Sequence, residues 1–364
     1  MKKTKDYRYW VYEHEYEEQS SFFKTIEGLI ANNGIRLNAL LLSSQENMLN
    51  HFQNWIPSSY KIKITNNEPI FSINLTKEGH EPIDIAFVKH PQNPSVYITL
   101  SDCKADEFKE FTKFINKYFP DISKIFLTNN EMFLIFKKIE KLGYTVMVEF
   151  SVGKKRLMGT KKESFIRYTN KPYKEVFEDI VQNDQWIQSV RYRADYPEMD
   201  ENGRIWTAFN GTITRDCYYS IKKDFQVLIR NIIPYSLELA STRNKHLKLS
   251  VESADKPKPE AVVINFEKDI FTSSEKNGSY IDAITTMSSC SVSRYHSNPY
   301  LHISLVDYLD GSSYDLWVLT SDRMVIIPQF SASNASMRRL VNHVFERIHD
   351  GKVEKYREIK AQIQ

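Results

Sequence analysis

The pattern that most constrains the fold lies near the C-terminus, where strand, turn and helix signals follow one another without conflict. Three runs of alternating apolar residues, separated by turn residues, predict three strands at 301–308, 314–320 and 324–330. The next segment, 333–350, repeats apolar residues at the spacing of an amphipathic helix, with Ser333 as a cap before it and Gly351 as a stop after it. These signals predict a C-terminal β-β-β-α module whose helix packs on one face of its sheet.

The rest of the chain mixes strand and helix patterns. Aromatic residues at 7–12 predict a strand and residues 20–31 a helix, while two further strands, 205–210 and 212–219, are separated by Gly211. Runs of successive strands combined with helices are typical of α+β proteins and not of doubly wound sheets. We therefore predict an α+β fold with mixed or antiparallel sheets flanked by helices.

A chain of 364 residues is long enough for two or three domains, each with its own core. The composition becomes basic after residue 153, and two prolines alternate with charges just before residue 260, as in an extended connector. The predicted organisation is an N-terminal α+β domain at 1–153, a middle α+β domain at 154–252, a linker at 253–260 and the C-terminal domain at 261–364.

Composition narrows the class of protein. Hydrophobic residues make up 41% and charged residues 26% of the chain, which excludes wholesale disorder. No apolar run approaches the roughly 18 residues needed to cross a bilayer, so no membrane contact is expected. The three cysteines are odd in number and far apart, which predicts a reduced, cytoplasmic protein.

Several common enzyme motifs are missing from the sequence. No two of the eleven glycines lie two residues apart, which excludes the standard dinucleotide fingerprint, and no P-loop occurs. The chain has no Cys-x-x-Cys and no His-Glu-x-x-His pattern, and its nine histidines lack ligand spacing. We expect neither a cofactor nor a metal site, and a protein that is more a binding subunit than an enzyme.

Three side chains are nevertheless candidates for catalysis. His302 and Ser304 have the His-x-Ser form found in phosphoesterases that use two histidines, but the second histidine motif is missing. The spacing of Arg338 and His343 resembles a motif of small helical ribonucleases, although those proteins have no sheet. The ordinary interpretations are a strand histidine and the polar face of a helix.

The strongest functional signal is a basic stretch at 154–174, which holds eight basic residues and one acidic residue, interleaved with aromatic side chains. Clustered cations bind phosphates, and flat rings stack on bases or pack on sugars. Two arginines on the next predicted strand would extend the stretch. The predicted nucleic-acid-binding residues are Lys154, Lys155, Arg156, Lys161, Lys162, Arg167, Tyr168, Lys171, Lys174, Arg191 and Arg193.

These observations predict a non-catalytic nucleic-acid-binding or assembly subunit of a cytoplasmic bacterial complex, with defence against foreign DNA or phage as its context. The expected partners are DNA or RNA, together with a protein partner or a second copy of the chain. Two alternatives remain open: a metal-independent ribonuclease or phosphoesterase, and an oligomeric scaffold that binds only protein. The ordinary interpretation of any one basic stretch is a solvated surface.

Overall fold

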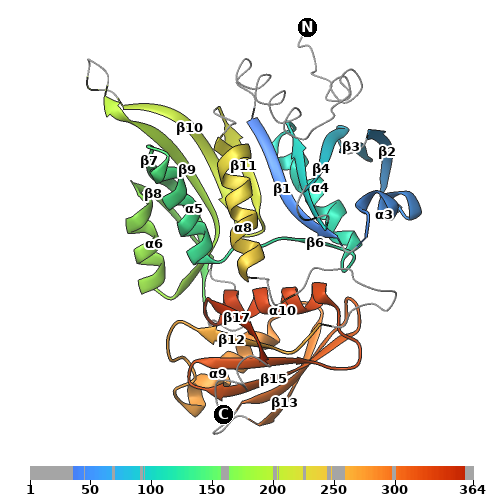
Figure 1. Ribbon diagram of the computed structural model, residues 1–364, viewed down its shortest axis with the longest axis vertical. Coiled ribbons are helices and arrows are strands. Elements are labelled where there is room, and N and C mark those ends of the chain that lie inside the picture. Colours follow the sequence, from blue (N-terminus) through green and yellow to red (C-terminus); the bar gives the residue numbers. More distant parts are fainter. Residues whose placement is uncertain are drawn as a thin grey trace.

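The computed structural model describes residues 36–356, apart from 45, 68–69, 91–92, 94, 157–163, 200–202, 204, 224–226, 244–246, 248–258 and 297–300. The strand predicted at 7–12, the helix predicted at 20–31 and most of the predicted linker lie outside the described residues. The described chain forms two antiparallel sheets with helices packed against them, which is the predicted α+β class (Figure 1).

The larger sheet has eleven strands in the order β2-β3-β4-β5-β1-β11-β10-β9-β7-β8, and β6 pairs with β1. Its neighbouring strands are antiparallel throughout. The strands are β1 Arg36–Ser44, β2 Tyr60–Asn67, β3 Ile70–Lys77, β4 Ile83–Lys89, β5 Val96–Ser101, β6 Ile122–Lys124, β7 Thr145–Lys155, β8 Ser164–Pro172, β9 Gln185–Met199, β10 Ile205–Thr214 and β11 Tyr218–Lys222.

Helices cover the two faces of this sheet unevenly. On one face, α5 (Asn129–Lys141), α6 (Tyr173–Gln182) and α8 (Ile233–Arg243) lie over β7 to β11 (Figure 1). On the other face, α3 (Met48–Asn54) and α4 (Ala105–Ile115) pack over β1 to β5. In the described part of the chain, the second face of β7 to β10 therefore has no helix packed over it.

The strands before and after residue 153 belong to the same sheet. The boundary predicted near that residue falls inside β7, which pairs with β9 along its whole length. The break predicted at Gly211 is wrong, because β10 continues through it. A Cβ on Gly211 would lie 2.8 Å from the backbone oxygen of Ser220 and 3.0 Å from the hydroxyl of Tyr192, so the glycine permits close strand packing and does not make a turn.

The smaller sheet has the order β13-β14-β15-β16-β12-β17. The strands and helices predicted between 301 and 350 correspond to β14, β15, β16 and α10, whereas β12, β13 and β17 extend the sheet beyond the predicted module. The elements are β12 Val262–Phe266, α9 Ser274–Thr285, β13 Cys290–His296, β14 His302–Asp307, β15 Ser312–Thr320, β16 Arg323–Pro328, α10 Asn334–Arg347 and β17 Gly351–Lys355.

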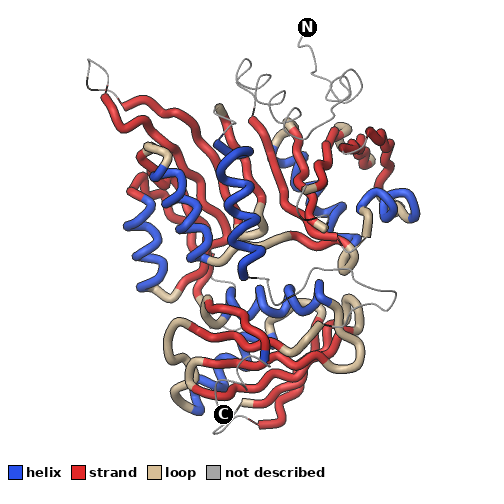
Figure 2. The backbone as a smooth tube through the Cα atoms, viewed as in Figure 1, coloured by secondary structure: helices blue, strands red, loops and turns tan. Residues whose placement is uncertain are grey.

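Helix α10 lies between the two sheets (Figure 2). Its apolar residues pack with the core of the smaller sheet, while its polar residues on another side meet the body of the larger sheet. Side chains of this helix therefore make several of the contacts between the two bodies, and Asp350, just after it, adds an ion pair with Arg156. None of the helices in the described ranges is long and apolar enough to cross a bilayer.

Candidate nucleic-acid interface

The predicted basic stretch does not form one continuous surface. Lys154 and Lys155 end β7, whereas Lys174 lies in α6, on the helix-covered face of the sheet. Arg156 is 6% exposed and points into the protein. Lys161 and Lys162 lie outside the described residues, as does the side chain of Tyr168.

Most of the described cations in this prediction have a carboxylate partner. An ion pair at the surface contributes little to stability, but it reduces the positive potential that a phosphate would meet. The pairs are Arg156–Asp350 at 3.4 Å, Arg167–Asp179, Lys171–Glu175 at 4.0 Å, Lys174–Glu140 at 2.8 Å, Arg191–Glu149 at 3.3 Å and Arg193–Asp195 at 2.9 Å.

A different group of cations gathers around Trp186 at the start of β9. The Nζ atom of Lys154 lies 5.4 Å from the centroid of the Trp186 ring, and the Cζ atom of Arg215 also lies 5.4 Å from it. The electron-rich faces of an indole ring attract cations. Trp186 is only 5% exposed, so its role is to hold these two cations in place.

Beside Trp186 lies a groove of about 560 Å³, which we call the α4 groove. Lys109 and Lys113 of α4 line one side of it, and Ser189 of β9 and Thr214 of β10 line the sheet side. Lys109 forms an ion pair with Asp106, and Lys113 forms one with Glu110. The groove lies where α4 ends its coverage of the sheet and the uncovered strands begin.

Side chains of β9 and β10 that point to the same face continue the groove along the part of the sheet that no described helix covers. Ser189 pairs with Thr214, and Arg191 pairs with Thr212. Side chains two residues apart on a strand point to the same face, so Arg191 follows Ser189 on the face that lines the groove. Arg193 is the next side chain in this row. We call this row, with its partners on β10, the open sheet face.

The inner end of the groove is electrostatically unusual. Arg215 and Glu346 both line it, and Nε of Arg215 lies 3.3 Å from Oε1 of Glu346. Burial raises the pKa of Glu346, against the opposing effect of Arg215. The Nη1 and Nη2 atoms of Arg215 and the Nε1 atom of Trp186 are buried and have no hydrogen-bond partner among the described residues.

Sequence reasoning did not find Lys109, Lys113, Trp186 or Arg215. These residues belong to α4, β9 and the turn after β10, and only the sheet order brings them together. The sequence did predict Lys154, as part of the basic stretch, and Arg191 and Arg193, whose two-residue spacing predicts a shared strand face.

His302 lies on the face of the smaller sheet away from α10. Its ring stacks between Tyr295 and Trp317, with ring centroids 4.8 Å and 3.7 Å away. Nε2 lies 4.0 Å from Oδ1 of Asp315. His296 is opposite His302 in the β13–β14 pair. The position of His302 is thus that of a stacked strand histidine.

Arg338 and His343 lie on different sides of α10. Five residues correspond to roughly 140° around a helix, so the predicted spacing separates these side chains. Arg338 donates to the hydroxyls of Ser43 and Ser123 in the larger body. The Nε2 atom of His343 lies 3.1 Å from the backbone oxygen of Ala283, and burial lowers the pKa of His343 to about 4. The structure does not bring the two side chains together.

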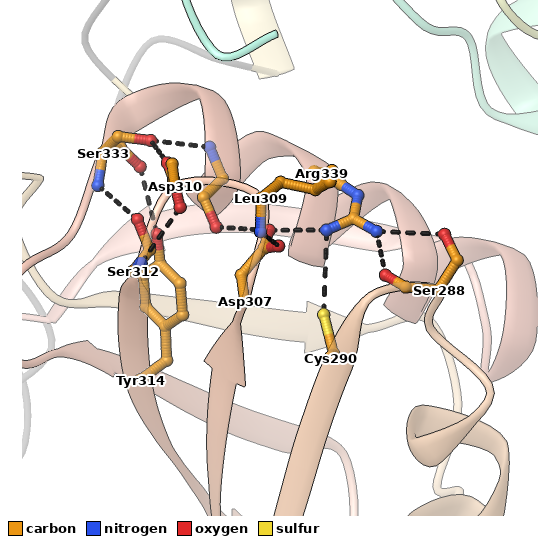
Figure 3. A network of polar contacts seen from close by, with 10 residues as sticks. Ser288, Cys290, Asp307, Leu309, Asp310, Ser312, Tyr314, Ser333 and Arg339 are labelled. Atoms are coloured by element: carbon orange, nitrogen blue, oxygen red, sulfur yellow. Dashed lines mark hydrogen bonds and ion pairs between the residues drawn. The ribbon is translucent and has the colours of Figure 1, made fainter.

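Arg339 holds α10 to the smaller sheet. Its Nη1 atom donates to Oδ2 of the fully buried Asp307 at 2.6 Å, and its Nη2 atom donates to the backbone oxygen of Ser288 (Figure 3). Figure 3 also places the thiol of Cys290 beside this guanidinium, 3.7 Å from Nη1. Arg339 is therefore engaged in the fold.

Within the described ranges, no group of three or more His, Cys, Asp or Glu residues is placed to hold a metal ion. A comparison with protein-family models gave no match, and a comparison with curated proteins gave none.

Proposed function

We propose that this protein is a non-catalytic, nucleic-acid-binding subunit and that DNA or RNA lies in the α4 groove and along the open sheet face. The observation that carries the proposal is the position of Lys109, Lys113, Lys154 and Arg191 around a part of the larger sheet that no described helix covers. Lys109, Lys113 and Arg191 each also form an ion pair with a carboxylate, which reduces their share of the positive potential. These side chains come from separate elements, and cations arranged around a groove attract a phosphate backbone.

The sheet itself supports the proposal. Its open face carries serine and threonine hydroxyls at positions 189, 212 and 214, which are suitable donors to phosphate and sugar oxygens. Ile166 on β8, which β7 separates from β9, is 60% exposed and offers an apolar contact. A rigid sheet also holds these groups at fixed spacing, which reduces the entropy lost on binding.

In this proposal, the protein belongs to a cytoplasmic complex in which a partner protein carries out the catalysis. His302 is stacked between two rings, and Arg338 and His343 face different neighbours, so no pair of these candidates forms an acid–base arrangement. The neutral state that the low pKa of His343 implies at pH 7 also removes its positive charge from phosphate binding.

The test is fluorescence anisotropy with labelled single-stranded and duplex oligonucleotides over a salt titration. The variant Lys109→Gln/Arg191→Gln removes two cations from the groove and the open sheet face. Its matched control, Lys171→Gln/Lys174→Gln, removes two cations near and on α6. We expect the first variant to bind about tenfold or more weakly and to reduce the salt slope by about two, because each phosphate contact contributes about one.

Binding by the α6 control is expected to equal that of the unchanged chain. A chain that binds neither oligonucleotide at low salt contradicts the proposal and favours the protein-only scaffold. An equal loss of affinity in both double variants contradicts the assignment of the α4 groove.

A further inference from the structure

Four arginine side chains are buried where the two bodies meet. Arg156, Arg215, Arg243 and Arg338 are each less than 10% exposed. They come from the end of β7, the turn after β10, α8 and α10, so their proximity is a property of the fold. Burial lowers the pKa of Arg215, Glu346 and Asp350 oppose this, and the nearby charges of Arg156 and Arg243 lower the pKa further.

The carboxylates that face this cluster are fewer than the arginines. Glu131 lies 2.8 Å from Nε of Arg243, Glu346 lies 3.3 Å from Nε of Arg215, and Asp350 lies 3.4 Å from Nη2 of Arg156. Arg338 contacts the hydroxyls of Ser43 and Ser123 in place of a carboxylate. The junction therefore buries an excess of positive charge.

The unused hydrogen-bonding atoms of this cluster are mainly donors. Nη1 of Arg156, both Nη atoms of Arg215 and Nη1 of Arg243 are buried and lack an acceptor among the described residues. The indole Nε1 of Trp186 is also buried and has no acceptor among the described residues. Buried donors without acceptors are unfavourable, and buried charges require a partner of opposite sign. An oxyanion would supply both the acceptor atoms and the charge.

Two cavities reach the cluster, and their charges differ. Arg156 lines a cavity of about 370 Å³ between α5 and α6, but Glu178, Asp184 and Glu267 also line it. Lys109, Lys113 and Arg215 line the α4 groove, together with the carboxylates of Asp216 and Glu346. The first cavity therefore has more carboxylates than cations and the α4 groove more cations than carboxylates, so an anion is repelled less strongly from the groove.

We infer that Arg215 and Trp186 form a binding site for a phosphoryl group at the inner end of the α4 groove. A phosphoryl group has several acceptor oxygens and up to two negative charges, which matches the unused donors of Arg215 and Trp186. A group that binds the folded chain and not the unfolded chain raises its stability. The inference rests on the arginine cluster and stands even if oligonucleotide binding fails.

The first experiment titrates the full chain with inorganic phosphate at constant ionic strength, with chloride as the reference anion. Calorimetry measures binding, and thermal unfolding measures the gain in stability. We expect saturable phosphate binding and a rise in Tm that chloride does not give. A chain whose Tm and heat signal respond equally to phosphate and chloride overturns the inference.

Two variants locate the site. Arg215→Lys keeps the positive charge but loses both Nη donors and the Nε contacts with Asn342 and Glu346, and we expect it to weaken phosphate binding about tenfold or more. Trp186→Phe removes the Nε1 donor together with part of the ring that Lys154 and Arg215 contact, and we expect a smaller loss of about threefold to tenfold. Lys174→Gln, on α6 and away from the groove, is the control and is expected to bind phosphate normally. Unchanged affinity in both Arg215→Lys and Trp186→Phe would overturn the site.

A comparison of oligonucleotides with and without a terminal phosphate separates the sources of the phosphoryl group. Tighter binding of the phosphorylated strand, lost in Trp186→Phe, supports a nucleic-acid end as the ligand. Equal binding of both strands, together with phosphate binding that depends on Arg215, supports a free phosphate compound.

Discussion

Two sides of helix α10 make contacts of opposite kinds. The side toward the smaller sheet carries Leu340, Val344 and Phe345, all fully buried in an apolar core. The side toward the larger sheet carries Arg338, Asn342 and Glu346, one every four residues, each bonded to a polar side chain of the other body. Apolar burial stabilises without requiring matched partners, whereas the polar side depends on specific pairs. The apolar side thus builds the C-terminal body, and the polar side determines how it meets the larger sheet.

The largest expected effect is on the apolar side. Phe345→Ala removes a fully buried ring and leaves a cavity, so we expect the free energy of unfolding to fall by about 3–5 kcal/mol. Urea unfolding monitored by circular dichroism measures this loss. A decrease below about 1 kcal/mol would contradict the packing described for α10.

The neighbouring residue tests the polar side. Glu346→Gln removes the charge facing Arg215, and we expect the free energy of unfolding to fall by about 1.5–3 kcal/mol, since a buried guanidinium loses its charged partner. The double variant Arg215→Met/Glu346→Leu removes both charges and is expected to recover part of the loss in the same urea assay. If the double variant is no more stable than Glu346→Gln, the pair does not interact as described.

His343, on a third side of α10, is expected to make the free energy of unfolding depend on pH. The unfolded chain takes up a proton on His343 near pH 6.5, whereas the buried side chain has a pKa of about 4. The unfolded state therefore binds more protons between these values, and the stability present above pH 6.5 falls as the pH decreases. We expect a loss of about 1.5 kcal/mol between pH 6.5 and pH 5 from this group.

The matched control is His343→Gln, which keeps a donor for the backbone oxygen of Ala283 but does not titrate. Urea unfolding at each pH gives the difference between the two proteins, in which the titration of other groups cancels. Parallel pH profiles for the unchanged chain and the variant would contradict the burial of His343.

The smallest expected effect on the free energy of unfolding is at the start of α10, where Ser333 caps the helix. The Ser333 hydroxyl accepts a hydrogen bond from the backbone N–H of Ser336 at 3.0 Å. Ser333→Ala is therefore expected to lower the free energy of unfolding by about 1 kcal/mol, measured by urea unfolding. Ser331→Ala, just before the cap, is the control, and an equal loss in both variants would contradict the capping role.

The apolar side of α10 was predictable from sequence because its signal is local. Apolar spacing, the cap residue Ser333 and the stop at Gly351 lie within twenty residues of one another. The same local reasoning gave a break at Gly211, where the glycine instead allows Tyr192 and Ser220 to approach closely. A single sequence gives no sign of which strand will lie beside a glycine.

The candidate site was not predictable, because its residues come together only in the tertiary structure. Lys109, Trp186 and Arg215 meet only through the order of the strands. The basic stretch at 154–174 was visible as a charge pattern, but its carboxylate partners, such as Asp350 and Glu140, are distant in sequence. Charge can be counted from sequence, whereas its neutralisation depends on tertiary contacts.

The most direct test of the nucleic-acid assignment is hydrogen–deuterium exchange of the full chain with and without a bound oligonucleotide. We expect slower exchange in α4 and in the parts of β9 and β10 that form the open sheet face, with no change in α6. Protection confined to α6 and β8, or no protection at saturating oligonucleotide, would contradict binding in the α4 groove.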